Sequence, residues 1–202
     1  MAQQQSNPRR ALLVGLLVLA CGWYAGAGRA VVPMSQAPSP PAEVRLELPD
    51  ARQWGSGRLT YLFFHVYDMH LWANADFDAG RYEQLPLALQ LDYARDLSGV
   101  KIAERSITEM LRSGEIAADK QARWLAAMTK AFPNVVEGDR ITGVQIPATA
   151  TRFFVNGRLT GEVRDAEFTR LFFGIWLSPR TSEPKLRAAL LAGLLQTKRG
   201  GS

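Results

Sequence analysis

The chain has 202 residues, of which 47% are hydrophobic and 21% charged, and its formal net charge is +5. This size and composition exclude a collagen, a coiled coil and wholesale disorder, and they allow one substantial hydrophobic core. We therefore expect one folded domain and no second one.

The first thirty residues have the pattern of a secretory signal peptide. Arg9 and Arg10 precede an apolar run at 11–20 that is too short to span a bilayer as a mature helix. Residues 25–27, Ala-Gly-Ala, fit a signal-peptidase site, and a cut after Ala30 is the alternative. The sequence therefore predicts a leader at 1–30 and an exported, periplasmic protein.

The single cysteine, Cys21, allows two interpretations. It follows Val-Leu-Ala at 18–20, which resembles the lipobox of bacterial lipoproteins, so it is either an acylated anchor or an ordinary leader cysteine. One cysteine excludes an intramolecular disulfide. We expect membrane contact only through the leader or through this anchor.

The net charge says little about partners once the leader is set aside. Three of the 24 basic residues, Arg9, Arg10 and Arg29, belong to the leader, which leaves 21 basic against 19 acidic residues. No cluster of lysine and arginine interleaved with aromatic residues stands out along the chain, so we predict no nucleic-acid partner.

A proline-rich linker and a short strand are expected next. Prolines at 33, 38, 40 and 41 make residues 31–42 a stiff spacer. Val44, Leu46 and Leu48 then alternate with charged residues, which predicts a half-buried edge strand over 43–48. A turn through Gly55-Ser56-Gly57 should pair this strand with the following one.

The stretch 57–72 is too apolar for a surface segment and predicts one central strand. Strand parity places Tyr61, His65 and Tyr67 on one face, among apolar side chains. A face that mixes phenols and an imidazole with apolar groups is suited to lining a ligand cavity. A third strand is expected over 85–93, with Pro86 near its start.

Two helices and a further set of strands follow. Ser98 should cap a helix that ends at Gly114, and a second helix should end at Pro133, both covering one face of the sheet. Strands are expected at 140–146, 151–155 and 158–163, with Asn156-Gly157 as a type I′ hairpin turn. Two last helices, capped by Asp165 and Ser182, complete the chain before a basic tail.

This order predicts an α+β fold, in which a mostly antiparallel sheet carries helices on one face, as a single domain over 43–198. Signatures of metal or cofactor chemistry are missing from the sequence. His65 and His70 fall on opposite faces of one strand by parity, which argues against a metal site, and we expect no cofactor. Arg95 leaves a buried strand just after Tyr93, which makes it a candidate partner for an anion, whereas the ordinary interpretation of such a residue is a solvated arginine.

Residues 43–195 resemble the chalcone isomerase-like family, in its bacterial exported branch. The resemblance rests on short motifs that occur in family order, namely Gly55-Ser56-Gly57-Arg58, Val66-Tyr67, Leu71-Trp72, Tyr93-Ala94-Arg95-Asp96, Phe132-Pro133, Gly138-Asp139, Phe154-Val155-Asn156-Gly157, Ile175-Trp176-Leu177 and Leu186-Arg187. The resemblance implies an open-faced β-sandwich with a ligand cleft between the sheet and its helices.

The resemblance does not carry over the reaction of the plant enzymes, which close a chalcone to a flavanone. The threonine, tyrosine and asparagine positions of those enzymes fall near Leu62, Ile102 and Glu109, and their arginine has no clear counterpart among Arg45, Arg52 and Arg58. Without hydroxyls at these positions the differential stabilisation of the transition state would be lost.

Other family members resemble fatty-acid binders, in which an arginine and a tyrosine hold the carboxylate. The leading hypothesis is therefore a domain that binds a small amphipathic ligand, a fatty acid or a phenolic, lined by Tyr61, His65, Tyr67 and Arg95. One alternative is an intramolecular lyase or isomerase acting on a phenolic substrate, with Tyr67 or His65 as proton carrier. The other is an envelope scaffold that docks proteins through an apolar groove.

Overall fold

The computed structural model describes residues 38–194, which belong to one compact unit. The predicted leader, Cys21 and most of the proline-rich linker lie outside the described residues. Within 38–194, none of the helices combines the length and the apolar character needed to cross a bilayer.

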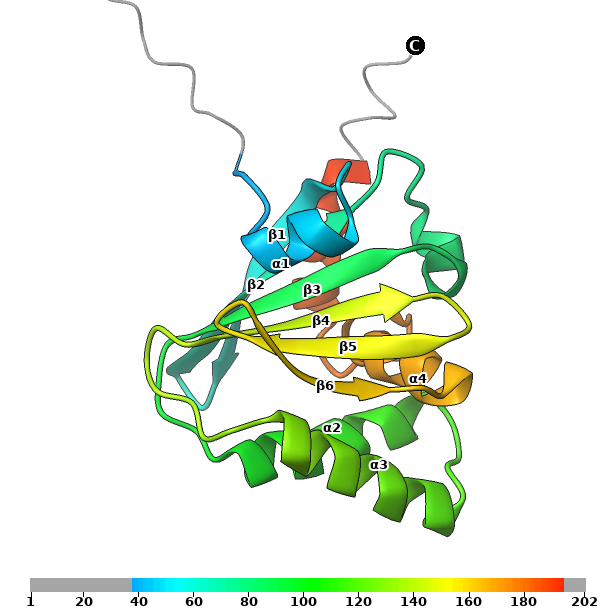
Figure 1. The fold of residues 1–202 in the computed structure, drawn as a ribbon. Coiled ribbons are helices and arrows are strands. Elements are labelled where there is room, and N and C mark those ends of the chain that lie inside the picture. Colours follow the sequence, from blue (N-terminus) through cyan, green and yellow to red (C-terminus); the bar gives the residue numbers. More distant parts are fainter. Residues whose placement is uncertain (1–37, 195–202) are drawn as a thin grey trace, which may run out of the picture. The chain divides into compact units, whose positions relative to one another are not determined.

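Six antiparallel strands form one sheet in chain order, each hydrogen-bonded to the next (Figure 1). They are β1 (Arg52–Tyr61), β2 (Phe64–Ala73), β3 (Leu87–Tyr93), β4 (Arg140–Ile146), β5 (Ala150–Val155) and β6 (Arg158–Val163). The predicted mostly antiparallel sheet is confirmed, since every neighbouring pair is antiparallel.

Helices cover the sheet mainly on one face, which confirms the α+β class. The segments between strands hold a 3₁₀ helix, η1 (Ala79–Gln84), and the helices α2 (Gly99–Ser113) and α3 (Ala118–Ala131). After β6 come α4 (Ala166–Leu177) and α5 (Pro184–Leu190). Helix α4 contacts β4 and β5, α3 contacts β6, and α5 contacts β1 and β2. Figure 1 shows the short helix α1 (Ala42–Glu47) in front of the sheet and α4 behind it.

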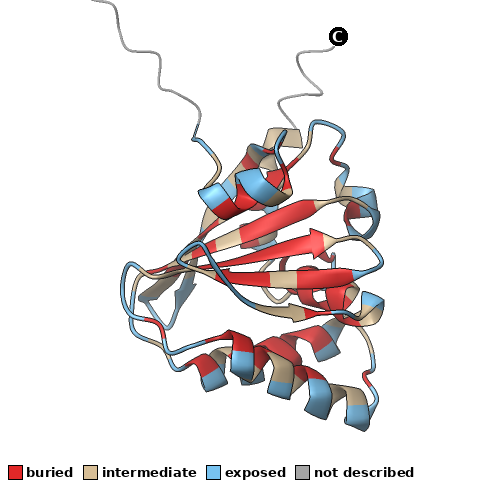
Figure 2. Cartoon of the chain, viewed as in Figure 1, coloured by how far each residue is buried: buried red, intermediate tan, exposed pale blue. Residues whose placement is uncertain are grey.

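The main core lies between the sheet and helices α2 to α5, and Figure 2 shows the middle strands largely buried. An aromatic cluster holds β5 against α4: Phe153 meets Phe168 and Phe172 edge to face, with ring centroids 6.2 and 5.0 Å apart. Such edge-to-face pairs add to the free energy that their burial supplies. A smaller core lies under α1, on the other face of the sheet.

The prediction of a strand over 43–48 is wrong, because this segment forms helix α1. Val44 and Leu48, four residues apart, share the buried face of one helical turn, whereas Leu46 is 76% exposed. Glu43 is buried as well, and its carboxylate accepts hydrogen bonds from Arg140 Nε and Thr142 Oγ1, each at 2.9 Å. Contacts of Glu43 with Arg140 and Thr142 on the distant strand β4 thus stabilise a helix that the alternation of apolar and charged residues did not predict.

The prediction of one central strand over 57–72 is also wrong, because the stretch contains a hairpin. The glycines at 55 and 57 lie inside β1, and the chain reverses at Leu62 and Phe63, whose φ values are +47° and +69°. Neither residue is typical of such a turn, so no turn is predicted at 62–63 from the residues themselves. The turn predicted at 55–57 does not form.

Most of the local signals at the other element ends are confirmed. Asn156 and Gly157 form the tight turn between β5 and β6, with φ values of +49° and +83°. Asp165 caps α4 by accepting hydrogen bonds from the backbone N–H groups of Glu167 and Phe168. Ser182 does not cap the last helix, which begins at Pro184, because its hydroxyl donates to Glu109 Oε2 instead.

Candidate ligand cavity

A cavity of about 360 Å³ lies between the sheet and the helices, within the size range of small-molecule sites. Its walls come from the β1–β2 hairpin, from β3 and β4, from one side of α2 and from the C-terminal half of α4. The apolar part of the lining comprises Leu59, Val66, Leu89, Leu91, Leu97, Ile102, Phe132, Ile141, Phe172, Ile175 and Trp176.

Two buried phenols stand side by side in the cavity wall. Tyr67 on β2 and Tyr93 on β3 are register partners, and their rings meet edge to face with centroids 5.8 Å apart. The indole N–H of Trp176 donates to the Tyr67 hydroxyl at 2.9 Å. Within residues 38–194 no group accepts the hydroxyl protons of these two tyrosines, so both can donate to a molecule in the cavity.

Burial raises the pKa of Tyr67 and of Tyr93 well above the usual value of a phenol, because a phenolate would lose its hydration. For Tyr67, the hydrogen bond from Trp176 opposes that rise without cancelling it. Both phenols are therefore neutral near pH 7. They offer hydrogen-bond donors and act as weak acids, not as bases.

Three cationic side chains, Arg95, Lys101 and Arg105, line the same cavity. Lys101 Nζ pairs with Glu104 at 2.8 Å, and Arg105 pairs with the carboxylate of Glu109 at 2.6 Å. Arg95 is different, because no carboxylate within residues 38–194 lies close enough to form an ion pair with it. Its guanidinium lies over the ring of Phe64, 5.1 Å from the ring centroid, which leaves its positive charge available to an anion.

Glu109 supplies a buried carboxylate beside these cations. It is 7% exposed, pairs with Arg105 and Arg112, and accepts a hydrogen bond from Ser182. This arrangement ties α2 to the segment that precedes α5. The cavity thus combines an apolar wall with a polar side, which is formed mainly by α2 and by Arg95 just after the end of β3.

The structure brings together three of the four residues that the sequence suggested. Tyr61, Tyr67 and Arg95 line the cavity, whereas His65 does not. The register explains this: Leu59 pairs with Tyr67 but Thr60 pairs with His65, so β2 carries one extra residue between them. A bulge of this kind puts His65 on the opposite face of the sheet from Tyr67.

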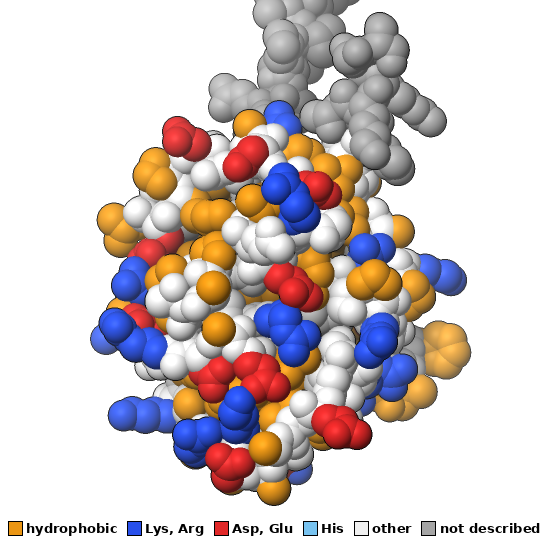
Figure 3. All heavy atoms as spheres, turned by 90° about the vertical axis from the view of Figure 1, so that its right-hand side faces the viewer, with side chains coloured by type: hydrophobic (Ala, Val, Ile, Leu, Met, Phe, Trp, Pro, Cys, Tyr) orange, Lys and Arg blue, Asp and Glu red, His pale blue; other side chains and the backbone are white. Residues whose placement is uncertain are grey.

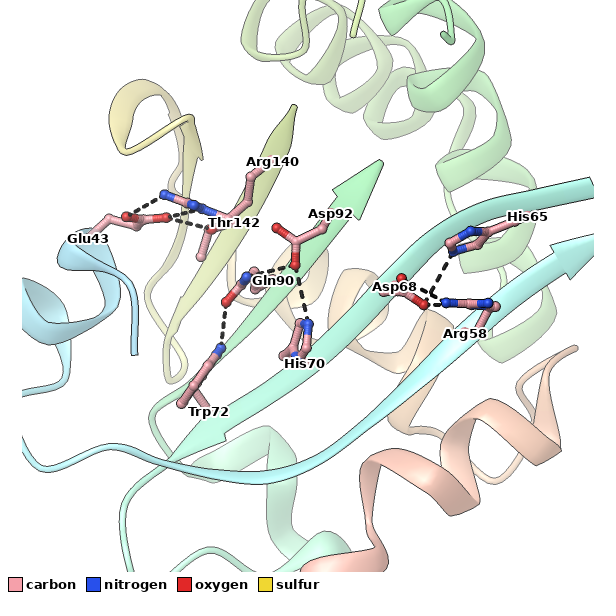
Figure 4. A network of polar contacts seen from close by, with 10 residues as sticks. All are labelled: Glu43, Arg58, His65, Asp68, His70, Trp72, Gln90, Asp92, Arg140 and Thr142. Carbon is pink, nitrogen blue, oxygen red and sulfur yellow. Dashed lines mark hydrogen bonds and ion pairs between the residues drawn. The ribbon is translucent and has the colours of Figure 1, made fainter. Parts of the chain in front are cut away.

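The bulge also overturns the parity argument for the histidines, since His65 and His70 lie on the same face. His65 Nε2 is 3.2 Å from Asp68, and His70 Nε2 is 3.2 Å from Asp92 (Figure 4). Arg58 also binds Asp68, at 2.8 Å, and holds the pKa of that carboxyl below its usual value. Within the described part of the chain, no three histidine, cysteine or acidic residues are grouped as metal ligands.

The rest of this opposite face holds structural contacts. Gln90 accepts from the indole of Trp72 at 2.9 Å and donates to Asp92 at 2.7 Å, next to the Glu43–Arg140 pair (Figure 4). Acidic and basic side chains are interspersed over the side of the molecule seen in Figure 3, so that side carries no continuous basic surface.

Sequence reasoning touched α2 only through the family resemblance, which places two positions of the plant enzymes near Ile102 and Glu109, and it missed Arg105 and Ser106. Ile102, Arg105, Ser106 and Glu109 lie at offsets 0, 3, 4 and 7 along α2, on one face of the helix, and line one side of the cavity. Charged residues at this spacing are usually the solvated face of a helix, so the pattern held no signal that separates the two cases. The spacing identifies one face of α2, but only the packing of the helix shows that this face lines the cavity.

Comparison with known proteins agrees with this architecture. A fatty-acid binding protein of Arabidopsis thaliana shares the fold, with a TM-score of 0.56 and 12% sequence identity over 73% of this chain and 91% of the plant protein. An uncharacterized protein of Haemophilus influenzae is 30% identical over 139 residues, which are 68% of this chain and 66% of the relative, or just under two thirds of its length. The chalcone isomerase-like family matches residues 52–192. The chain belongs to the chalcone isomerase-like family.

Proposed function

We propose that this protein is an exported binding domain for a small amphipathic molecule, a fatty acid or a phenolic, and that it lacks chalcone isomerase activity. The cavity of about 360 Å³ carries the proposal, because its apolar lining meets two free phenolic donors in the wall and an unpaired, solvent-exposed cation, Arg95. A cavity of this size lowers stability relative to a core filled by side chains, and a binding role accounts for its presence.

The cavity has a separate place for each end of such a ligand. A carboxylate or phenolate would meet the guanidinium of Arg95, whose fork of N–H groups fits a carboxylate with two parallel hydrogen bonds. The hydroxyls of Tyr67 and Tyr93 would add donors on the sheet side. A hydrocarbon tail would take the apolar lining, and the likeness of the fold to a plant fatty-acid binding protein supports this assignment.

Two features support the proposed lack of isomerase activity. The lining contains neither threonine nor asparagine. Leu62, which falls near the position of the family's catalytic threonine, lies in the β1–β2 turn and is 67% exposed. Donors that are preorganised around the reacting oxygen provide much of the rate of such reactions, and a solvent-facing leucine cannot serve as one.

Native mass spectrometry of the full chain, purified from its own cells without detergent, tests the proposal. We expect a bound mass that disappears on organic extraction, and rebinding of the extracted molecule or of a long-chain fatty acid. Arg95→Gln should weaken the binding of a fatty acid about tenfold or more, because it removes the charge partner of the carboxylate. Arg81→Gln, a substitution on η1 away from the cavity, is the matched control. Recovery of an empty protein that ignores fatty acids and phenolics would refute the proposal.

A second candidate function is an intramolecular lyase or isomerase on a phenolic substrate. The observation that favours it is the Tyr67 phenol, which Trp176 orients and which burial keeps protonated in an apolar space. Such a group stays protonated near pH 7 and can donate to a developing oxyanion, and its raised pKa makes it a weaker general acid than an ordinary phenol. His65 is not carried forward as a proton carrier, because it does not line the cavity. Turnover of a phenolic substrate that survives Tyr67→Phe would reject this role.

Export is tested separately by cell fractionation. We propose a periplasmic location on the strength of the leader pattern at 1–30. The mass of the mature chain distinguishes a cut after Ala27 or Ala30 from acylation at Cys21. A chain that stays in the cytoplasm with its N-terminus intact would contradict the location and leave the cavity argument unchanged.

A further inference from the structure

The end of the β1–β2 hairpin exposes four consecutive apolar side chains. Tyr61, Leu62, Phe63 and Phe64 are 59%, 67%, 101% and 61% exposed, and Figure 2 colours this end of the hairpin as exposed. We call these four residues the apolar tip. Exposed apolar residues are ordinary when they occur singly, but a contiguous group marks an interaction site.

The backbone at the apolar tip makes this exposure more unusual. Leu62 and Phe63 have φ values of +47° and +69°, close to the +49° and +83° of Asn156 and Gly157 at the other tight hairpin. Asparagine and glycine adopt this conformation readily, whereas leucine and phenylalanine are strained in it. The chain thus holds two bulky apolar residues in solvent at a turn where polar residues would be more stable. Strain of this kind concentrates at functional positions.

We propose that the apolar tip inserts into the interfacial region of a lipid bilayer and brings the cavity mouth to the membrane surface. The tip is continuous with the cavity, because Tyr61 belongs to both and Arg95, a cavity residue, lies against Phe64. Aromatic side chains are favoured at the depth of the headgroups. The positive charge of Arg95, which lies over Phe64 of the tip, also favours approach to an anionic lipid surface.

The size of the tip favours a bilayer over a protein partner. Four side chains with these exposed fractions present on the order of 500 Å², since an aromatic side chain offers roughly 150–250 Å². A stable protein interface needs about 800 Å² from each partner. A narrow protruding turn also fits a fluid interface, which closes around it, better than the flat surface of a second copy.

Membrane docking by the apolar tip does not depend on the proposed function. The purpose of docking does rest on the proposed function, because it requires that the cavity bind a fatty acid. A cavity that binds fatty acids and opens beside an inserted tip can exchange its ligand with the bilayer without passing it through water. Leu62 and Phe63 do not line the cavity, so changing them separates membrane docking from ligand binding.

Tryptophan at position 63 reports insertion directly. The full chain carrying Phe63→Trp is mixed with vesicles of equal parts phosphatidylethanolamine and phosphatidylglycerol, some carrying a brominated acyl chain. We expect a blue shift of the emission and quenching by the brominated lipid that exceed those of the parent chain measured alongside, because the two chains share Trp23 of the leader and the four buried tryptophans and differ only at position 63. Unchanged emission would overturn the proposal, even if the chain floats with the vesicles, because attachment would then come from another segment.

The double variant Leu62→Asn and Phe63→Gly copies the other hairpin's turn and should fold at least as well as the parent chain. We expect it to bind fatty acid in solution unchanged and to exchange fatty acid with donor vesicles at least tenfold more slowly. The matched control is Leu46→Asn with Leu159→Asn, which removes two exposed apolar side chains far from the tip.

Equal exchange rates in the two double variants would overturn the inference. So would self-association of the parent chain, without vesicles, that the tip variant abolishes. Failure of the parent chain to bind any fatty acid would instead count against the proposed function alone.

Discussion

The pair of buried tyrosines allows a sharp test of how the cavity wall is held together. Tyr67 accepts a hydrogen bond from the indole N–H of Trp176, whereas the Tyr93 hydroxyl has no partner within the described residues. Both rings are buried and lie 5.8 Å apart, so they share nearly the same surroundings. Replacing each by phenylalanine removes one oxygen and leaves the ring in place.

Tyr67→Phe should be the costly substitution. It leaves the Trp176 N–H buried without an acceptor, which costs about 1–3 kcal/mol, since a lost partner exposes the full desolvation penalty of the remaining group. Tyr93→Phe removes a hydroxyl that faces only the cavity, and its effect should stay within about 0.5 kcal/mol. For a domain of ~150–250 residues each kcal/mol lowers the thermal midpoint by about 2–4 °C.

Urea unfolding, monitored by tryptophan fluorescence and by circular dichroism, measures both variants under the same conditions. Equal slopes against urea for the parent chain and both variants would show that the difference lies in stability alone. The reasoning is refuted if Tyr93→Phe destabilises the protein as much as Tyr67→Phe does, or if neither substitution has a measurable effect.

Three further outcomes follow from the fold. Gly55→Ala should destabilise the protein by about 1–3 kcal/mol or prevent folding, because the new Cβ would lie 2.3 Å from the backbone oxygen of Ala189; thermal unfolding measures this. Glu43→Gln should release helix α1 from the sheet, since it breaks a buried ion pair with Arg140, and amide exchange over 42–47 should then rise severalfold. Stability should also fall as the pH rises from 10 towards 12. Burial raises the pKa of Tyr82 to about 12, so the native state keeps a proton that the unfolded chain has lost, and unfolding titrations at stepped pH should show the loss. Constant stability across that range would contradict the burial of Tyr82.

Signals that act within a few residues allowed much of the fold to be predicted. Asn156-Gly157, the Asp165 cap and the stop at Pro133 each determine the backbone through their own chemistry, and the structure has all three. Helix α1 could not be predicted in this way. The carboxylate of Glu43 finds its guanidinium partner 97 residues away, and nothing close to residue 43 in the chain indicates that contact.

In the candidate site, too, the residues marked by local sequence signals could be predicted, and those placed by tertiary packing could not. Arg95 could be singled out because it leaves a buried strand, and it does line the cavity. His65 was misplaced because one extra residue in β2 reverses its side, and strand parity cannot detect a bulge without a glycine or a proline to mark it. The contribution of Arg105 and Glu109 depends on how α2 lies against the sheet, which is a tertiary property.

Helix α5 closes over the first strand of the sheet, with glycines on both sides of the contact. Gly55 of β1 lies against the backbone of Ala189 and Leu190, and Gly193 lies against the backbone of Trp54. The start of the folded domain is therefore completed by almost its last described residues. During synthesis the face of β1 that packs on α5 remains uncovered until the C-terminal segment has emerged, and a chain shortened before α5 would expose that face to other chains. Such a truncation should lead to aggregation, because the sheet is complete at the end of β6 but β1 is covered only when α5 packs on it.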